Sequence, residues 1–267
     1  MNRALFVQTW RSQRTKLIVV VIALAFWSSL MPIVYGSFGQ MFRSIIESGL
    51  IPIEFTRFGG GDIFSLSGSL ALGAIHPISL LLVCIFAVGF AAAAVAGERQ
   101  RGTLEVVLAR PLSRRTVYVT LLAATLVFVA ITLLATIIGA IVGSGIAGVA
   151  NELEFGRLPL LWLNGFLIFG AIGAIGLAAS VSFDRLTPAL GITIGFVVLM
   201  YFLDVLGTFW PDAKWLQPYS LIHYYAPKAV LEGVSSAGDL LVGAVVSAVA
   251  IAWALVVFPR RDLAAPS

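Results

Sequence analysis

The sequence predicts an all-α, polytopic membrane protein, and two observations carry this prediction. Hydrophobic residues make up 60% of the 267 residues, whereas charged residues make up only 11%; an ordinary soluble domain is about half apolar. The apolar residues also form uncharged runs of roughly 20 residues, the length that a helix needs to cross about 30 Å of hydrocarbon. Too little chain remains outside these runs for a separate soluble domain.

Six membrane spans follow from these runs. They cover residues 17–37, 76–97, 117–147, 159–182, 187–207 and 238–258. The end of the third span is the least sharp, because several glycines follow one another between residues 139 and 148. The first run is longer than the apolar part of a signal peptide, about 7–15 residues, so we expect it to be retained as a span.

Lys and Arg residues lie unevenly on the two sides of these spans. Six spans place both termini on one side, together with the 98–115 segment and the turn at 183–186. That side holds twelve of the seventeen cations, so the positive-inside rule makes it cytoplasmic and the protein a multi-pass component of the plasma or inner membrane. The twelve are Arg3, Arg11, Arg14, Lys16, Arg99, Arg101, Arg110, Arg114, Arg115, Arg185, Arg260 and Arg261.

Three further segments lie outside the predicted spans. Residues 1–16 mix apolar and basic side chains, which predicts a helix on the inner leaflet, with a frayed basic tail as the alternative. On the outer side, residues 38–52 have apolar residues near helical spacing, and the GGGD stretch at 59–62 predicts a flexible link after this helix.

Residues 208–237 form an outer segment rich in aromatic residues and divided by three prolines. An aromatic belt at the membrane surface and a re-entrant gate over a substrate path both fit this composition. Asp204 lies just before it, near the outer end of the fifth span, where a charge is costly unless it is paired or hydrated; a simple interfacial position is the alternative. The candidates for a substrate path or gate are Asp204, Tyr201, His223, Tyr224 and Tyr225.

Several classes of function leave no signature in this sequence. It contains no phosphate-binding loop of the G-x-x-x-x-G-K-[ST] type, no H-E-x-x-H pair and no Cys/His cluster. We therefore predict no catalytic residue, no metal site and no cofactor bound by this chain, and we do not expect it to be an enzyme by itself. The basic residues flank the spans, so the net charge of +4 is explained by membrane topology rather than by nucleic acid.

Small residues recur at a spacing that lets helices approach closely. Gly139 and Gly143 form one such pair, and Gly191 and Gly195 form another. Packing inside one bundle explains most of these positions, while one pair could form a seam between two subunits.

The segment from residue 98 to residue 115 is unusually charged for its surroundings and predicts a short helix of its own. Gly102 permits a bend, Thr103 can cap the helix, and Glu105 suits the positive end of its dipole. Leu104, Val107 and Leu108 form one apolar stripe, and Pro111 ends the helix. Such a stripe needs a surface to bury against, which either lipid or another protein can supply.

This charged segment resembles the signature of membrane subunits of type-2 ATP-binding cassette (ABC) permeases. The matching stretch, GERQRGTLEVVLARPLSRR, covers residues 97–115. The resemblance implies that residues 98–111 form a coupling helix that docks into an ATPase subunit. The coupling residues would then be Glu98, Arg99, Arg101, Gly102, Thr103, Leu104, Glu105, Val107, Leu108, Arg110 and Pro111.

The resemblance also implies a function and an assembly. The chain would be the permease subunit of an ABC exporter, paired as a homodimer with two copies of a nucleotide-binding ATPase that binds ATP and Mg. The sparsely charged spans favour an apolar or amphipathic substrate. A stand-alone secondary transporter or channel is the alternative, and it predicts more polar groups within the membrane and inverted repeats.

Overall fold

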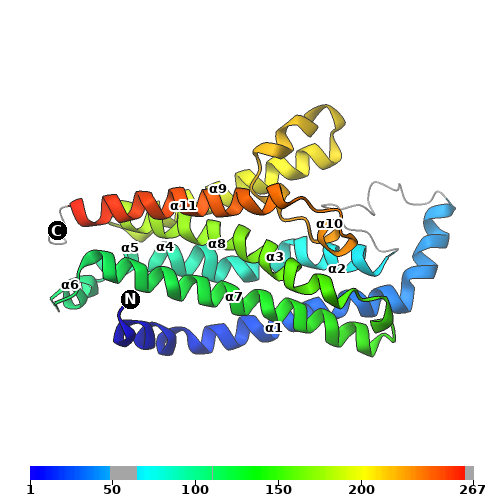
Figure 1. Cartoon of the computed structure of the whole chain (residues 1–267), viewed down its shortest axis with the longest axis horizontal. Coiled ribbons are helices and arrows are strands. Elements are labelled where there is room, and N and C mark those ends of the chain that lie inside the picture. The colour runs from blue at the N-terminus through cyan, green and yellow to red at the C-terminus, as the bar shows by residue number, and fades with distance from the viewer. Residues whose placement is uncertain (49–64, 110, 262–267) are drawn as a thin grey trace.

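A computed structural model describes residues 1–48, 65–109 and 111–261. All regular structure within these ranges is helical. The long helices lie side by side along one axis and form a single elongated bundle (Figure 1). Five described helices are long and apolar enough to span a membrane, and a bent helix pair makes a sixth. The all-α, polytopic fold predicted from the sequence is confirmed.

The first span belongs to one long helix, α1 (Arg3–Glu47). Residues 3–16 are its first turns, so the separate N-terminal helix expected at 1–16 runs into the 17–37 span without a break. Few helix-breaking residues interrupt this stretch, and Pro32 is accommodated inside the helix. The predicted outer helix at 38–52 appears as the last turns of α1, while its end and the GGGD link lie outside the described residues.

The second span is broken rather than continuous. Helix α2 (Leu66–Ile75) and helix α3 (Pro77–Cys84) meet at His76 with a bend of 49°. A π-helix, η2 (Ile85–Phe90), and helices α4 (Ala91–Ala93) and α5 (Ala96–Gln100) follow. The span predicted at 76–97 thus begins at the first break, where Pro77 starts a new helix, and it is interrupted by a second break near Val95, which was not predicted.

The remaining spans are regular. They are α7 (Arg114–Ile146), α8 (Leu158–Ser182, preceded by η3, Ala150–Glu152, and η4, Phe155–Arg157), α9 (Leu186–Phe209) and α11 (Ala237–Arg260). In the most apolar stretch of the α8 span 61% of residues are buried, against 11% for α9. Helix α8 is thus at the centre of the bundle, whereas α9 has an open face.

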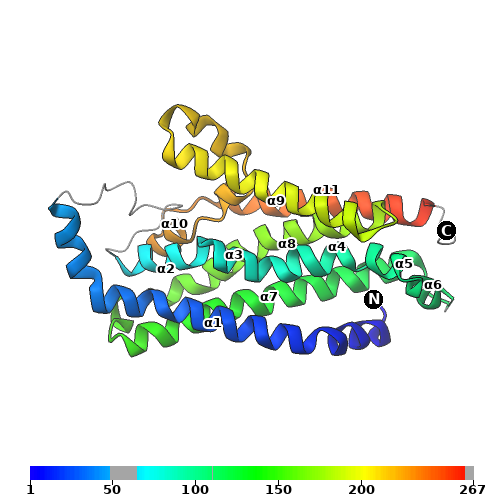
Figure 2. The same ribbon diagram turned by 180° about the vertical axis from the view of Figure 1, so that it is seen from behind.

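The two ends of the bundle differ in character (Figures 1 and 2). One end, here named the terminal end, carries the start of α1, the short helix α6 (Thr103–Leu108) and the end of α11. The other, named the aromatic end, carries α2 and α10 (Pro227–Glu232). The last turns of α9 and η5 (Pro211–Tyr219) project from the bundle near this end, and η6 (Ile222–Tyr224) returns the chain to it.

The two glycine pairs have different surroundings. Gly139 and Gly143 on α7 face the backbone of α1, where an added methyl group would lie 2.2 Å from the carbonyl oxygens of Ala25 and Ser29. Gly191 and Gly195 on α9 have no described atom within 4 Å of such a methyl group. One pair is therefore used inside the subunit, and the other lies on the open face of α9.

Candidate functional site

The charged segment begins with the predicted bend. Helix α5 ends at Gln100, and Gly102 turns the chain with φ 71° and ψ 6°, in the left-handed region. A side chain added at Gly102 would meet no described atom within 4 Å. Glycine is therefore required here by its backbone conformation, not by lack of space.

The side chains around this bend are organised by Glu98 rather than by a helix cap. Thr103 was expected to cap α6, but the cap position is Gly102 and no side chain caps this helix. The Thr103 hydroxyl instead donates to the Glu98 carbonyl oxygen at 3.1 Å and contacts the Glu98 carboxylate. Arg101 forms an ion pair with the same carboxylate. The capping prediction was wrong because the sharp turn directs the Thr103 hydroxyl back towards α5.

The apolar stripe of α6 packs against its own bundle. Leu104 is only 3% exposed and belongs to the main core, and Leu108 is half-buried against that core. Glu105 and Val106 point the other way, with Val106 67% exposed. The side chain of Val107, and Arg110 altogether, lie outside the described part of the chain. The surface that the leucines need is therefore supplied by the subunit itself.

The third span begins where the charged segment ends, and its first residues fasten it to α11. Pro111 lies between α6 and α7, and the Ser113 hydroxyl caps α7 by accepting from the Thr116 amide at 3.1 Å. Helix α7 therefore starts at Arg114, three residues before the predicted boundary. The Arg114 guanidinium donates to the Phe258 carbonyl oxygen at 3.2 Å, a favourable place for a cation because the carbonyl end of a helix carries negative charge.

A cluster of charges at the terminal end was not predicted as a site. Asp184, in the turn between α8 and α9, forms ion pairs with Arg99 of α5 and with Arg261 at the end of α11. Gln100 accepts from the Leu186 amide at 2.9 Å beside this cluster. From the sequence, Asp184 looks like a solvated turn residue, because its partners lie 85 and 77 residues away.

The second break in the span, next to the charged segment, is stabilised by α8. Ser180 is fully buried, and its hydroxyl accepts from the amides of Val95 at 2.9 Å and Ala96 at 3.0 Å. It donates to the Ala92 carbonyl oxygen at 2.8 Å. Buried backbone groups are costly when they have no partner, so Ser180 makes the break possible inside an apolar bundle.

An apolar groove of about 410 Å³ lies between the second span and α9. Its lining includes Leu81, Cys84, Val88, Val198 and Tyr201. The Tyr201 hydroxyl is buried and has no hydrogen-bond partner among the described residues. The groove can accept an apolar chain, with one polar group at its wall.

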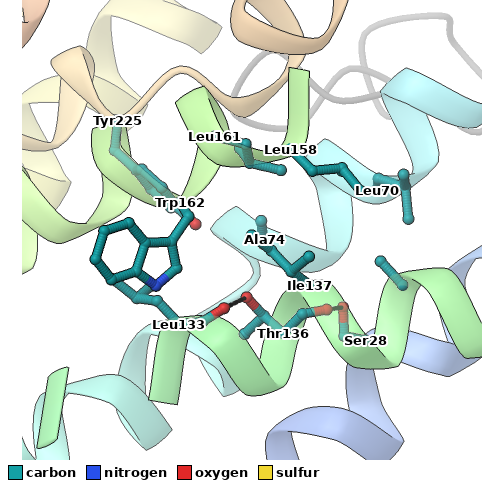
Figure 3. Close-up of a pocket in the computed structure, with 11 residues that line it drawn as sticks. Ser28, Leu70, Ala74, Leu133, Thr136, Ile137, Leu158, Leu161, Trp162 and Tyr225 are labelled. Carbon is teal, nitrogen blue, oxygen red and sulfur yellow. Dashed lines mark hydrogen bonds between the residues drawn. The ribbon is translucent and has the colours of Figure 1, made fainter. Parts of the chain in front are cut away.

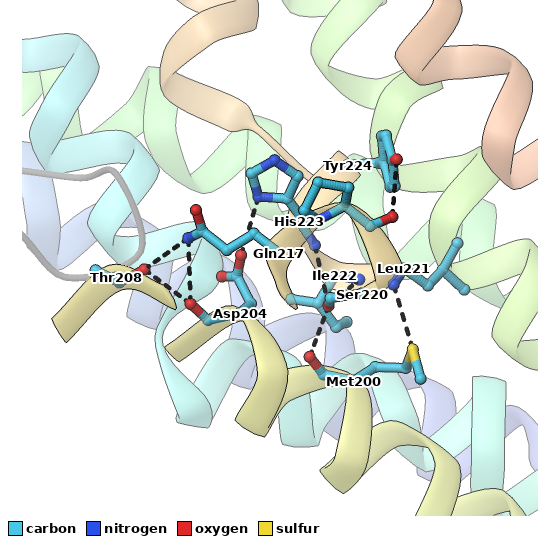
Figure 4. A network of polar contacts seen from close by, with 10 residues as sticks. Met200, Asp204, Thr208, Gln217, Ser220, Leu221, Ile222, His223 and Tyr224 are labelled. Carbon is cyan, nitrogen blue, oxygen red and sulfur yellow. Dashed lines mark hydrogen bonds and ion pairs between the residues drawn. The ribbon is translucent and has the colours of Figure 1, made fainter. Parts of the chain in front are cut away.

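The aromatic end holds a polar network close to Tyr201 in the sequence (Figure 4). Asp204 Oδ1 and His223 Nδ1 are 3.1 Å apart, which joins α9 to η6. Gln217 donates to the Asp204 carbonyl oxygen at 3.3 Å, and Ser220 donates to the Met200 carbonyl oxygen at 2.6 Å. The Asp204 charge therefore has a partner, as its position near the end of a span requires.

The two tyrosines that follow His223 are placed differently. The Tyr224 hydroxyl donates to the Pro218 carbonyl oxygen at 2.9 Å within the outer segment. Tyr225 is buried against Phe169 in an edge-to-face contact, and burial raises the pKa of its hydroxyl. Asp204, His223 and Tyr224 thus lie together at the aromatic end, whereas Tyr225 is part of the core.

The outer aromatic segment divides into an exposed and a buried part. Three of its aromatic side chains, Trp210, Trp215 and Tyr219, are exposed, as in an interfacial belt. Leu221 and Ile222 return into the bundle and are buried.

A small cavity deep in the bundle lies between α1, α2, α7 and α8 (Figure 3). It has a volume of about 20 Å³ and is lined by residues such as Leu70, Ile137 and Trp162. This is room for roughly one water molecule, so the cavity cannot pass a substrate.

Comparison with known families matches this architecture. The profile of the ABC-2 family transporter protein covers residues 6–263, nearly the whole chain. A search of curated proteins gave no match. This chain, a bundle of membrane-spanning helices, therefore belongs to the ABC-2 transporter family.

Proposed function

We propose that this chain is the permease subunit of an ABC exporter, driven by two copies of a separate nucleotide-binding subunit. The observation that carries the proposal is the orientation of α6. Leu104 fixes the helix to the bundle, and Glu105 and Val106 face outward at the terminal end. An exposed apolar residue beside a charged one, on a short helix whose other face is buried, is a suitable contact for another protein.

The same arrangement supports the orientation in the membrane. Twelve of the seventeen Lys and Arg residues of the sequence belong to segments assigned to one side, and the start of α1, α6 and the end of α11 lie at the terminal end. We assign this end to the cytoplasm of a cell with a plasma or inner membrane. ATP and Mg would be bound by the partner subunit, whose movement α6 would transmit to the second and third spans.

A homodimer would place the substrate path between the two subunits. Helix α9 has a largely exposed face. On this face Gly191 and Gly195 allow a second helix to approach closely. The groove beside α9 suits an apolar or amphipathic substrate. Tyr201, Asp204, His223 and Tyr224 lie at or near its outer end and would act as a gate.

The docking role of α6 is tested by Val106→Asp. A charge in a desolvated contact disfavours binding, so we expect the affinity for the ATPase subunit to fall by about tenfold or more. Val234→Asp is the matched control, because Val234 is 73% exposed and follows α10, which lies at the aromatic end. Affinity is measured by titrating the purified permease in nanodiscs with the nucleotide-binding subunit that co-purifies with it.

The outcomes separate the two candidate functions. Equal loss in both variants, or none in either, would contradict docking through α6. A chain that transports without any ATPase would instead be the stand-alone transporter or channel.

A further inference from the structure

Asp184 has two cationic partners from elements far apart in the chain. Arg99 lies on α5, four residues before the start of α6, and Arg261 follows the last residue of α11. Both guanidinium groups contact the same oxygen, Oδ1 of Asp184. The arginine side chains are 11% and 25% exposed, so they are held closely against the protein, whereas Asp184 is 57% exposed.

Neighbouring hydrogen bonds extend this contact across the terminal end. Arg261 Nη1, the guanidinium nitrogen that does not contact Asp184, donates to the Val181 carbonyl oxygen at 3.0 Å. Gln100 accepts from the Leu186 amide at 2.9 Å. Asp184 thus lies where α5, the α8–α9 turn and the end of α11 meet. Exposed ion pairs contribute little to stability by themselves. This cluster therefore matters for how these three elements are positioned rather than for the stability of the fold.

The geometry points to Asp184 as a positioning residue that transmits movement of the charged segment to α9 and α11. The inference rests on the proposed function, in which an ATPase displaces α6. Displacement of α6 also moves α5, because the two helices are separated only by Arg101 and Gly102. Through Asp184, the α8–α9 turn and the end of α11 would follow that displacement, in addition to the two spans joined directly to α6.

The test follows each element with a fluorescent label in the permease–ATPase complex in nanodiscs. Cys84 is the only cysteine in the sequence, so Cys84→Ser gives a background in which Val256→Cys labels α11 and Val119→Cys labels α7. Both sites are exposed. An environment-sensitive dye at each site reports the change caused by ATP with vanadate, and ATP hydrolysis is measured in the same samples.

In Asp184→Ala we expect the dye response on α11 to fall by about threefold or more, while the response on α7 and ATP hydrolysis remain. Asp184→Glu should restore the α11 response, which a merely structural role would not predict. Arg261→Gln should reproduce the loss, and Arg260→Gln is its control, because Arg260 is exposed and adjacent to it in sequence. This second pair keeps the test decisive if Asp184→Ala fails to fold.

Three results have distinct meanings. An α11 response that persists in Asp184→Ala or Arg261→Gln would overturn the inference. A complex that retains Asp184 and hydrolyses ATP, but gives no dye response on α11, would also overturn the inference. Failure of the ATPase to bind the permease at all would instead refute the proposed function, on which the inference depends.

Discussion

At the scale of single residues, Gly139 and Gly143 set the distance between α1 and α7. Both helices are apolar, so burial of apolar surface does not distinguish their contact from contact with lipid tails. Close backbone approach is what favours the pair, and the Ala25 and Ser29 carbonyl oxygens occupy the space of the missing side chains. These two glycines are therefore required by packing, in contrast to Gly102.

Gly139→Ala should destabilise the subunit. The new methyl group would lie 2.2 Å from the Ala25 carbonyl oxygen, so one helix has to move. We expect a loss of about 1–3 kcal/mol, the usual cost of overpacking, measured as a lower melting temperature in detergent. Gly145→Ala on the same helix meets no described atom within 4 Å and should have little effect. Equal melting temperatures for the two variants would contradict the packing argument.

At the scale of elements, the charged segment consists of a bend at Gly102 and the short helix α6, which is packed on the bundle. Gly102 sets the direction of α6, Glu98 ties the two sides of the bend together, and Leu104 fixes the helix to the core. Helix α6 exposes Val106 because its other face is buried against the core. Its geometry therefore depends on backbone conformation as much as on contacts.

Gly102→Ala should impair function more than folding. Alanine in the left-handed region costs about 1–2 kcal/mol, which favours a changed bend and a misdirected α6. Gly148→Ala is the matched control, because Gly148 has φ 70°, a similarly empty surrounding and a position far from α6. We expect ATP hydrolysis by the complex to fall only in Gly102→Ala, while both variants lose similar stability. A similar loss of hydrolysis in both would show that the bend itself is unimportant.

Local signals predicted a good part of these elements. Long uncharged runs located the spans and Gly102 located the bend, because each depends on residues a few positions away. The cap expected from Thr103 was wrong, and the partners of Leu104 and Asp184 were not identified, because tertiary packing chooses these contacts. The break near Val95 was missed as well: apolar composition does not reveal it, and Ser180 lies 85 residues from Val95.

At the scale of the whole molecule, the exposed face of α9 leaves the helix bundle open on one side. Helix α8 is enclosed by its neighbours, while α9 leaves a glycine face and an apolar groove open. Lipid alone can cover such a face, but the pair of open glycines favours a helix from a second copy.

Gly195→Leu tests this assembly. A leucine should prevent close helix approach and weaken dimerisation by about tenfold, with the subunit's own melting temperature unchanged because no described atom is within 4 Å. Dimer fraction is measured by single-molecule photobleaching in nanodiscs. Ala248→Leu on the exposed side of α11 controls for added bulk facing lipid. If both variants dimerise equally, the seam lies elsewhere.

The π-helix at Ile85–Phe90 makes the length of the second span matter, not only its composition. A π turn accommodates one residue more than an α turn. Loss of a single residue there would restore a regular α-helix and leave the downstream residues facing nearly the same way, whereas loss of one residue from a regular α turn rotates everything downstream by about 100°. Arg99 would keep facing Asp184 after the first deletion and would face away from it after the second, although every charge was still present. A deletion of one apolar residue inside the bilayer would thus act like a mutation of the charged segment outside it, except within the π turn, which absorbs it.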